Sequence, residues 1–237
     1  MAAVNNQPVL VGGAHPLTHK RTNVLGVWNK GSRTWTHPFP VLPTPRHLVV
    51  VISYHKWLIV AGGIDVDGSY TTKVEILDTS SRQWYEAAPL PNGCAGMSSA
   101  INGNMWYLSR GFSSMTDPNK GVFSVCLDEL ISRAVSQSDD VTSPSTPSPW
   151  QTLPDTPLRG STVLVLNGAL LAVGGSRSSA IRLYQPSNSS WVKVGDLPTE
   201  RSKCACIVLH SGEIFVAGGG SGPHGDITNC VDIVTIV

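Results

Sequence analysis

The sequence predicts an all-β protein built from about five repeated four-stranded units, and three observations support this prediction. The chain has 23 glycines and 17 prolines among 237 residues, about 17% against roughly 12% in average proteins. Charged residues make up only 14%, whereas a helical protein of this length places many more Glu, Lys and Arg on its solvent-facing surface. Apolar runs that end in glycine recur along the chain at similar intervals, which indicates a repeat architecture.

Five apolar runs end at or near a glycine doublet, and short runs of this kind are typical of buried strands. The runs are VLVGG (9–13), WLIVAGG (57–63), MWYLSRG (105–111), ALLAVGG (169–175) and EIFVAGG (213–219). The last glycines of successive runs are 50, 48, 64 and 44 residues apart. The third run ends in Arg110-Gly111, which we interpret as a degraded repeat; an arginine directed into a central channel is the alternative. A glycine pair suits a strand end where a neighbouring chain approaches closely.

A second element follows four of these runs, and it ends in tryptophan before a proline-rich turn. In three units the tryptophan stands seven residues after an aromatic residue or leucine: Trp28 and Trp35, Leu77 and Trp84, Tyr184 and Trp191. Leu127 and Trp150 are 23 residues apart, which we interpret as the same spacing plus an insertion. We expect these large side chains to fill the widening space between neighbouring sheets.

The insertion, residues 133–149, has the sequence RAVSQSDDVTSPSTPSP. It is rich in Ser, Thr, Pro and Asp and has almost nothing to bury, so we expect a flexible surface segment within the third unit. A segment that is phosphorylated at its Ser-Pro and Thr-Pro pairs is the functional alternative.

A four-stranded unit that recurs about every 48 residues predicts a blade of a β-propeller. We expect a single domain over 1–237 and 18 strands, since the chain begins at the second strand of its first unit and ends after the third strand of its last. Five full blades need 20 strands. A five-bladed ring with an imperfect seam and a part of a six-bladed ring both remain open.

The glycine doublets and the spaced tryptophans together resemble the Kelch repeat over nearly the whole chain. The matching residues are Gly12, Gly13, Gly62, Gly63, Gly174, Gly175, Gly218, Gly219, Trp35, Trp84, Trp150 and Trp191. The resemblance implies a Kelch-type β-propeller that serves as a non-catalytic protein-interaction module. Similar Kelch domains are substrate receptors in cullin-type ubiquitin ligases, or scaffolds associated with actin and kinases. Others are enzymes, such as copper oxidases of the galactose oxidase kind, so an enzyme acting on a sugar or small molecule is the alternative.

The motifs that would favour catalysis or a cofactor have simpler interpretations. Residues 220–225 match the glycine pattern of dinucleotide-binding loops, but the residues that follow are β-branched and alternating, which indicates a strand instead of the required helix. Asp65-Val66-Asp67-Gly68 begins like a calcium loop without its later ligands, and we interpret it as a type I′-like turn. We therefore expect no catalytic residue, metal or cofactor.

Charge and cysteine content limit the partners and the compartment. The formal net charge of +1 argues against nucleic acid or an anionic membrane as the main partner. The first residues lack the basic and apolar regions of a signal peptide, so we expect a cytoplasmic protein. The five cysteines are interpreted as small buried hydrophobic residues. Cys204 and Cys206 fall on the same face of a predicted strand, side by side.

The loops at one rim of a propeller come from several blades, and we expect the binding surface there. The turns between units contribute Arg46, His47, Arg159, Arg201 and Lys203. The loops within units contribute His15, Lys20, Arg21, Asp65, Asp67, Tyr70, Arg177 and His224. Several arginines beside a tyrosine and histidines suit an acidic or phosphorylated peptide of a protein partner.

Overall fold

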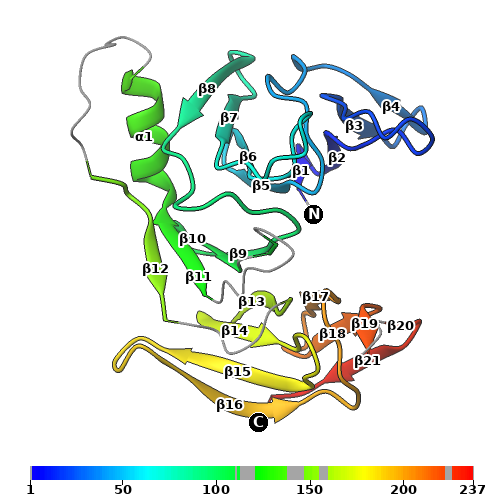
Figure 1. Cartoon of the computed structure of the whole chain (residues 1–237), viewed down its shortest axis with the longest axis vertical. Coiled ribbons are helices and arrows are strands. Elements are labelled where there is room, and N and C mark those ends of the chain that lie inside the picture. Colours follow the sequence, from blue (N-terminus) through cyan, green and yellow to red (C-terminus); the bar gives the residue numbers. More distant parts are fainter. Residues whose placement is uncertain are drawn as a thin grey trace. The chain divides into compact units, whose positions relative to one another are not determined.

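The computed structural model describes residues 2–109, 111–112, 121–137, 147–154, 160–221 and 226–236, and Figure 1 shows the chain. Within these residues the fold is all-β with a single helix, which confirms the predicted class. The chain divides into two compact units, and the single domain over 1–237 stays a prediction. Unit 1 comprises Met1–Gly96, Phe112–Met115 and Leu127–Pro149, and unit 2 comprises Met97–Gly111, Thr116–Cys126 and Trp150–Val237.

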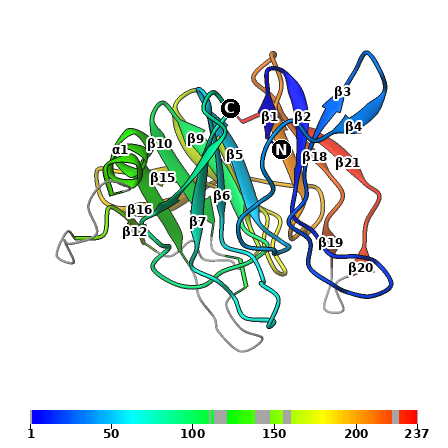
Figure 2. The same ribbon diagram turned by 90° about the horizontal axis from the view of Figure 1, so that it is seen from above.

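Unit 1 contains two four-stranded antiparallel sheets whose strands follow chain order. The strands are β1 (Ala3–Val4), β2 (Gln7–Val11), β3 (Leu25–Asn29) and β4 (Thr34–Thr36), then β5 (Val50–Tyr54), β6 (Trp57–Ala61), β7 (Val74–Asp78) and β8 (Gln83–Ala87) (Figure 2). β1 corrects the expectation that the chain begins at a second strand, because this short strand pairs with β2. Leu58, Ile59 and Val60 are all fully buried, so both faces of β6 are covered, as the continuous apolar run predicts.

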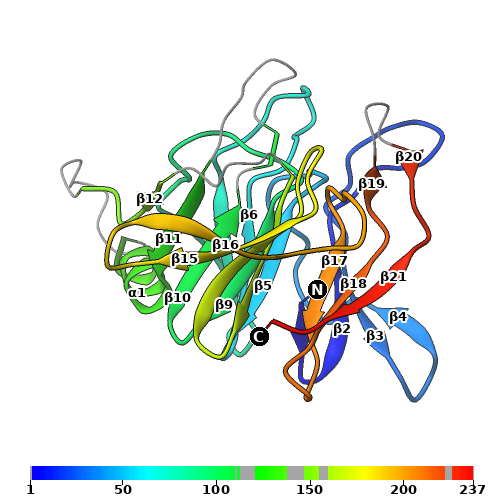
Figure 3. The same cartoon turned by 90° about the horizontal axis from the view of Figure 1, so that it is seen from below.

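Unit 2 contains two further four-stranded sheets, a three-stranded sheet and a two-stranded hairpin among its described residues (Figure 3). The four-stranded sheets comprise β9 (Ser98–Asn102), β10 (Met105–Ser109), β11 (Val122–Cys126) and β12 (Gln151–Leu153), and β13 (Thr162–Leu166), β14 (Ala169–Val173), β15 (Ala180–Gln185) and β16 (Ser190–Asp196). The others comprise β17 (Ala205–Val208), β18 (Ile214–Ala217) and β21 (Val231–Val234), and β19 (Gly220–Ser221) with β20 (Asp226–Ile227). One apolar cluster of this unit gathers side chains from β13, β14, β15 and β18, and a second gathers side chains from β11, β13 and β14.

The seven-residue spacing before each tryptophan has a structural explanation. Trp28 lies opposite Trp35, Leu77 opposite Trp84 and Tyr184 opposite Trp191 in adjacent antiparallel strands. In all three hairpins a four-residue loop joins the strands, and its last residue has a positive φ: Arg33, Arg82 and Ser189. A loop of fixed length places the two large side chains opposite each other, where cross-strand pairs stabilise the sheet.

The fourth spaced pair is an incorrect prediction, because Leu127 begins a helix instead of facing Trp150. Trp150 lies just before β12, and its ring centroid is 5.6 Å from that of Trp106 and 6.5 Å from that of Phe123. The tryptophans also differ in burial: Trp150 is 7% exposed, whereas Trp35 is 45% exposed. Both ring contacts of Trp150 lie within its own sheet, so the expected filling of the space between neighbouring sheets stays a prediction for Trp150, and it fails for Trp35.

The predicted flexible segment 133–149 begins in a helix, which corrects that prediction for its first residues. α1 (Leu127–Gln137) carries Asp128 and Glu129 in its first turn, where carboxylates interact favourably with the helix dipole. Leu127, Leu130, Ile131 and Ala134 are buried, and this spacing forms one apolar face that lies against β8. Residues 138–146 lie outside the described residues. No helix in the described part of the chain is long and apolar enough to cross a membrane.

The glycine doublets receive the chain that links one sheet to the next. A Cβ atom on Gly12 would lie 2.2 Å from the Arg46 carbonyl oxygen, and one on Gly174 would lie 2.2 Å from the Arg201 carbonyl oxygen. The second glycine donates its amide to the same oxygen, at 2.9 Å for Gly13 and 2.7 Å for Gly175. The predicted close approach of a neighbouring chain is therefore present at both doublets.

Candidate functional site

Arg46 has a buried structural position, which corrects the expectation that it lies on an exposed rim. Its side chain is 0% exposed and forms an ion pair with Glu75 of β7. Nε donates a hydrogen bond to the Gly62 carbonyl at 2.9 Å, and Nη2 donates one to the Val60 carbonyl at 3.3 Å. These groups use the donors of the guanidinium, so Arg46 fixes the turn between two sheets and presents no side chain to a partner.

Arg201 repeats this arrangement in unit 2, and the same correction applies. It is 1% exposed and forms an ion pair with Asp232 of β21. Nη1 donates to the Cys230 carbonyl at 3.1 Å, and Nε donates to the Thr199 hydroxyl at 3.2 Å. In both units the arginine connects a linker to the third strand of the following sheet. Removing the carboxylate partner of such a buried arginine strongly destabilises a protein, because it leaves an unpaired buried charge.

Four predicted residues of unit 1 come together, and we call them the loop cluster: His47, Asp65, Asp67 and Tyr70. The amide of His47 donates to the Ile64 carbonyl at 3.1 Å, and the amide of Ile64 donates to the His47 carbonyl at 2.9 Å. Ile64 also forms a bridge with Tyr70. His47 and Tyr70 are half-buried on either side of Ile64, whereas Asp67 is exposed.

The two aspartates of the loop cluster lie in a tight turn. The Ser69 amide donates to Asp67 Oδ1 at 2.8 Å and to Asp65 Oδ1 at 3.3 Å. The hydrogen bond between the carboxyl groups raises the pKa of Asp65 and lowers that of Asp67. Of the four residues 65–68, Gly68 alone has a positive φ, at 89°, so the predicted type I′-like geometry, which needs two, is wrong. The described residues contain no group of three or more His, Cys, Asp and Glu side chains that could hold a metal ion.

Two predicted residues of unit 2 are exposed cations on neighbouring loops, and we call them the Arg177–Lys203 patch. Both residues are exposed and have positive φ values of 56° and 55°. The Arg201 amide donates to the Ser178 carbonyl at 3.2 Å, and the Lys203 amide donates to the Gly160 carbonyl at 2.8 Å. The Arg201–Ser178 hydrogen bond joins two neighbouring loops. Arg177 directly precedes Ser178 in one loop, and Lys203 follows Arg201 by two residues in the other.

The remaining predicted residues occupy other places. His15 and Lys20 are exposed in a loop of the first sheet, where the His15 amide donates to the Lys20 carbonyl at 2.9 Å. Arg21 is half-buried and donates from Nη1 to the His19 carbonyl at 2.5 Å. Arg159 and His224 lie outside the described residues, so their predicted binding roles stay predictions.

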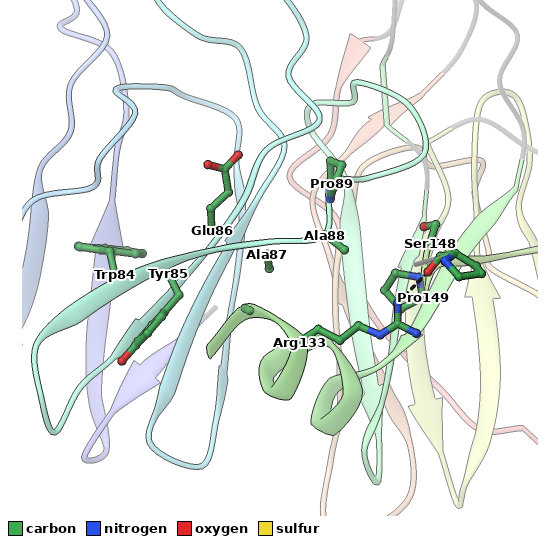
Figure 4. A pocket seen from close by; sticks show the side chains of 11 residues that line it. Trp84, Tyr85, Glu86, Ala87, Ala88, Pro89, Arg133, Ser148 and Pro149 are labelled. Carbon is green, nitrogen blue, oxygen red and sulfur yellow. Dashed lines mark hydrogen bonds between the residues drawn. The ribbon is translucent and has the colours of Figure 1, made fainter. Parts of the chain in front are cut away.

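A cavity of about 590 Å³ in unit 1 was not expected from the sequence. Residues of β8, including Trp84 and Tyr85, line one side, and Arg133 and Pro149 line the other (Figure 4). Arg133 donates to the Pro147 carbonyl at 2.7 Å and forms an ion pair with Glu129 at 2.5 Å. The helical spacing of Leu127, Leu130 and Ala134 is the sequence signal that could have predicted the helix on this side of the cavity.

Comparisons with known proteins agree with the repeat. The family model of the Kelch motif matches residues 45–91, which cover the sheet β5–β8, and the predicted resemblance is confirmed there. A search of curated proteins finds no match for the chain. The solved structure titled "Structure of YjhT" is similar with a TM-score of 0.78 and 15% sequence identity, covering 99% of this chain and 80% of that chain. At this identity the likeness concerns the fold, and the predicted class, a β-propeller of about five blades, is confirmed.

Proposed function

We propose that this chain is a non-catalytic protein-interaction module that binds its partner through loops between strands. The Kelch motif at residues 45–91 supports this proposal, because Kelch propeller domains generally bind protein partners. Backbone hydrogen bonds join the loops of the loop cluster, and those of the Arg177–Lys203 patch, to neighbouring segments, and loops held in place on a scaffold commonly carry binding residues.

The chemistry of the Arg177–Lys203 patch favours an acidic or phosphorylated segment of the partner. Arg46 and Arg201 are buried in ion pairs. Of the predicted binding residues that the structure describes in the linkers and in the fourth sheet, Arg177 and Lys203 are the exposed cations. A guanidinium binds carboxylate and phosphate oxygens through two parallel hydrogen bonds, and an ammonium adds a second point charge. This pairing of two cations on adjacent anchored loops is the observation that supports the proposal most directly.

The loop cluster of unit 1 has the opposite character. Its two aspartates accept hydrogen bonds, and the lowered pKa of Asp67 keeps that exposed carboxylate ionised. Tyr70 adds an aromatic ring with a polar tip, a residue type enriched at protein interfaces. We therefore assign the acidic segment of the partner to the Arg177–Lys203 patch.

An array of synthetic peptides tests this proposal. The array holds acidic, phosphorylated and neutral peptides, and it is probed with the wild-type chain and with Arg177→Glu/Lys203→Glu. We expect the wild-type chain to retain acidic or phosphorylated peptides, and the double variant to bind them at least about tenfold more weakly, since two charge-assisted contacts become repulsive. Added salt should weaken the wild-type binding.

The matched control is Lys193→Glu, which reverses an exposed charge that pairs with Asp196 at 2.7 Å on β16. This variant should bind as the wild type does. Neutral peptides bound as well as acidic ones, or equal affinity of the double variant and the wild type, would contradict the assignment to this patch.

A further inference from the structure

Two cysteines lie side by side in unit 2, and the proposed function does not use them. Cys204 directly precedes β17 and Cys206 lies within it, and their Sγ atoms are 3.6 Å apart. Cys204 is buried, and Cys206 is partly exposed. The confirmed same-face placement brings two thiols together without forming a disulfide.

The surroundings of the pair favour a thiolate on Cys204. The hydrogen bond from Cys206 lowers the pKa of Cys204 to about 7, with further contributions from the Thr162 hydroxyl and the charge of Arg201. The same interaction raises the pKa of Cys206, which therefore remains a thiol. The Thr162 hydroxyl lies 3.8 Å from Cys204 Sγ. A thiolate beside a neutral thiol is the arrangement in which one sulfur attacks and the other resolves.

We infer that Cys204 and Cys206 form a redox-sensitive dithiol, which hydrogen peroxide converts into an intrachain disulfide. The Cys204 thiolate attacks one oxygen of the peroxide, the O–O bond breaks, and a sulfenic acid and hydroxide form. Cys206 then attacks the sulfenic sulfur, an S–S bond forms, and the hydroxyl leaves as water with the Cys206 proton. The two sulfurs are oxidised, and the peroxide is reduced to water.

The strand geometry makes this disulfide a labile one. Residues two apart in an extended strand have Cα atoms about 6.4–6.8 Å apart, at the upper limit of roughly 6.8 Å for a disulfide. Closing the bond must therefore bend the start of β17, and strained disulfides are reduced readily. The loop that is closed spans three residues, so it restricts the unfolded chain little and adds little stability. We expect a reversible modification.

The position of the pair places this modification beside the Arg177–Lys203 patch. Lys203 precedes Cys204, and Ser202 exchanges two backbone hydrogen bonds with Gly220, both at 2.9 Å. A Cβ atom on Gly219 would lie 3.2 Å from the Cβ of Cys204, so the backbone around Cys204 has little room to move. Bending β17 should therefore shift the loop that carries Lys203.

Peptide mass spectrometry after mild oxidation tests the inference. The reduced chain is treated with graded hydrogen peroxide, its remaining thiols are alkylated, and the denatured protein is cut with trypsin and a glutamate-specific protease. Cleavage after Lys203 and Glu213 releases residues 204–213, which separates the pair from Cys230. We expect this peptide to lose two hydrogens and escape alkylation at peroxide levels that leave Cys94 and Cys230 reduced, and dithiothreitol should restore both thiols.

Two variants make the result specific. Cys206→Ser removes the resolving thiol, so Cys204 should stop at the sulfenic acid and react with dimedone, and no disulfide should form. Cys230→Ser, a change at an exposed cysteine, should leave the oxidation of residues 204–213 unchanged. Circular dichroism confirms that each variant is folded. Two results would overturn the inference. One is that Cys204 and Cys206 are both still alkylated after a peroxide treatment that already oxidises Cys230. The other is that dimedone labels Cys204 in the wild type and no disulfide forms.

Discussion

Gly12, the first glycine of its doublet, shows how a single residue determines the contact between neighbouring sheets. Gly12 has a φ of 63°, and the space where its Cβ would lie is occupied by the carbonyl oxygen of Arg46. Two separate properties of glycine are used here, namely freedom at positive φ and the absence of a side chain. Gly103 has a nearly identical φ of 60°, but nothing lies within 4 Å of its missing Cβ.

This difference predicts unequal costs for two glycine-to-alanine changes. Gly103→Ala should lower the free energy of unfolding by about 1–2 kcal/mol, the cost of a left-handed backbone for an L-residue. Gly12→Ala should cost about 1–3 kcal/mol more, because the new methyl group must displace a backbone carbonyl. Urea unfolding of both variants measures the difference. Equal losses would show that the Arg46 carbonyl does not press on this position.

At the scale of single elements, the turn between β7 and β8 depends on one carboxylate. Asp78 is 5% exposed, and its oxygens accept hydrogen bonds from the amide of Ser80 at 2.8 Å and from Lys56 Nζ at 2.7 Å. Burial acts to raise the pKa of Asp78, but the hydrogen bonds from Lys56, Ser80 and Ser81 outweigh it, and the pKa lies below its usual value. Asn29 makes equivalent amide contacts in the first sheet, accepting from Gly31 at 2.9 Å.

Because the folded pKa of Asp78 is lowered, its ionised form stabilises the protein above the unfolded pKa, and this stability is lost as the pH falls through the folded pKa. Asp78→Asn retains an oxygen for the amides and removes the ion pair, so it should lower the free energy of unfolding by about 1 kcal/mol at neutral pH. The difference from the wild type should shrink in acid. Urea unfolding of the wild type and Asp78→Asn from neutral to acidic pH measures this difference in the free energy of unfolding. A difference that does not change with pH would contradict the role of the carboxylate.

The helix α1 is an element that the sequence interpretation missed, as it missed β1, and its apolar face gives a direct test. Leu130 is fully buried, so Leu130→Ala should cost about 2–5 kcal/mol, the range for a large-to-small change in a core. Ser136 is exposed on the same helix and donates to the Ser132 carbonyl at 2.8 Å. Ser136→Ala is the matched control, and thermal unfolding should change little. If both variants have the same melting temperature as the wild type, the helix does not pack as described.

At the scale of the whole molecule, both units use the same device to join consecutive sheets. The carbonyl of Arg46 binds the glycine doublet of the sheet before it, while the guanidinium pairs with Glu75 in the sheet after it. Arg201 joins Gly175 and Asp232 in the same way. Cys94 takes the equivalent position in the second linker, where its carbonyl accepts the Gly63 amide at 2.7 Å. The backbone contact therefore recurs where the arginine does not.

The recurring pattern explains which of the predicted binding residues are exposed. Loop residues such as Asp67, Arg177 and Lys203 are exposed as expected, because segments that connect strands run over the protein surface. Arg46 and Arg201 occupy the same kind of turn but are buried. Their carboxylate partners, Glu75 and Asp232, are about 30 residues further along the chain, and no local pattern indicates such a pair.

The sequence by itself determined the all-β class, the repeated sheets and the opposed pairs such as Leu77 and Trp84, because these depend on local spacing, turn length and strand periodicity. Only the tertiary structure decided that Arg46 is buried, that Leu127 begins a helix and that Cys204 and Cys206 share one environment with Thr162. These outcomes depend on which distant groups remove a side chain from water, and that competition between burial and pairing is settled only when the sheets pack.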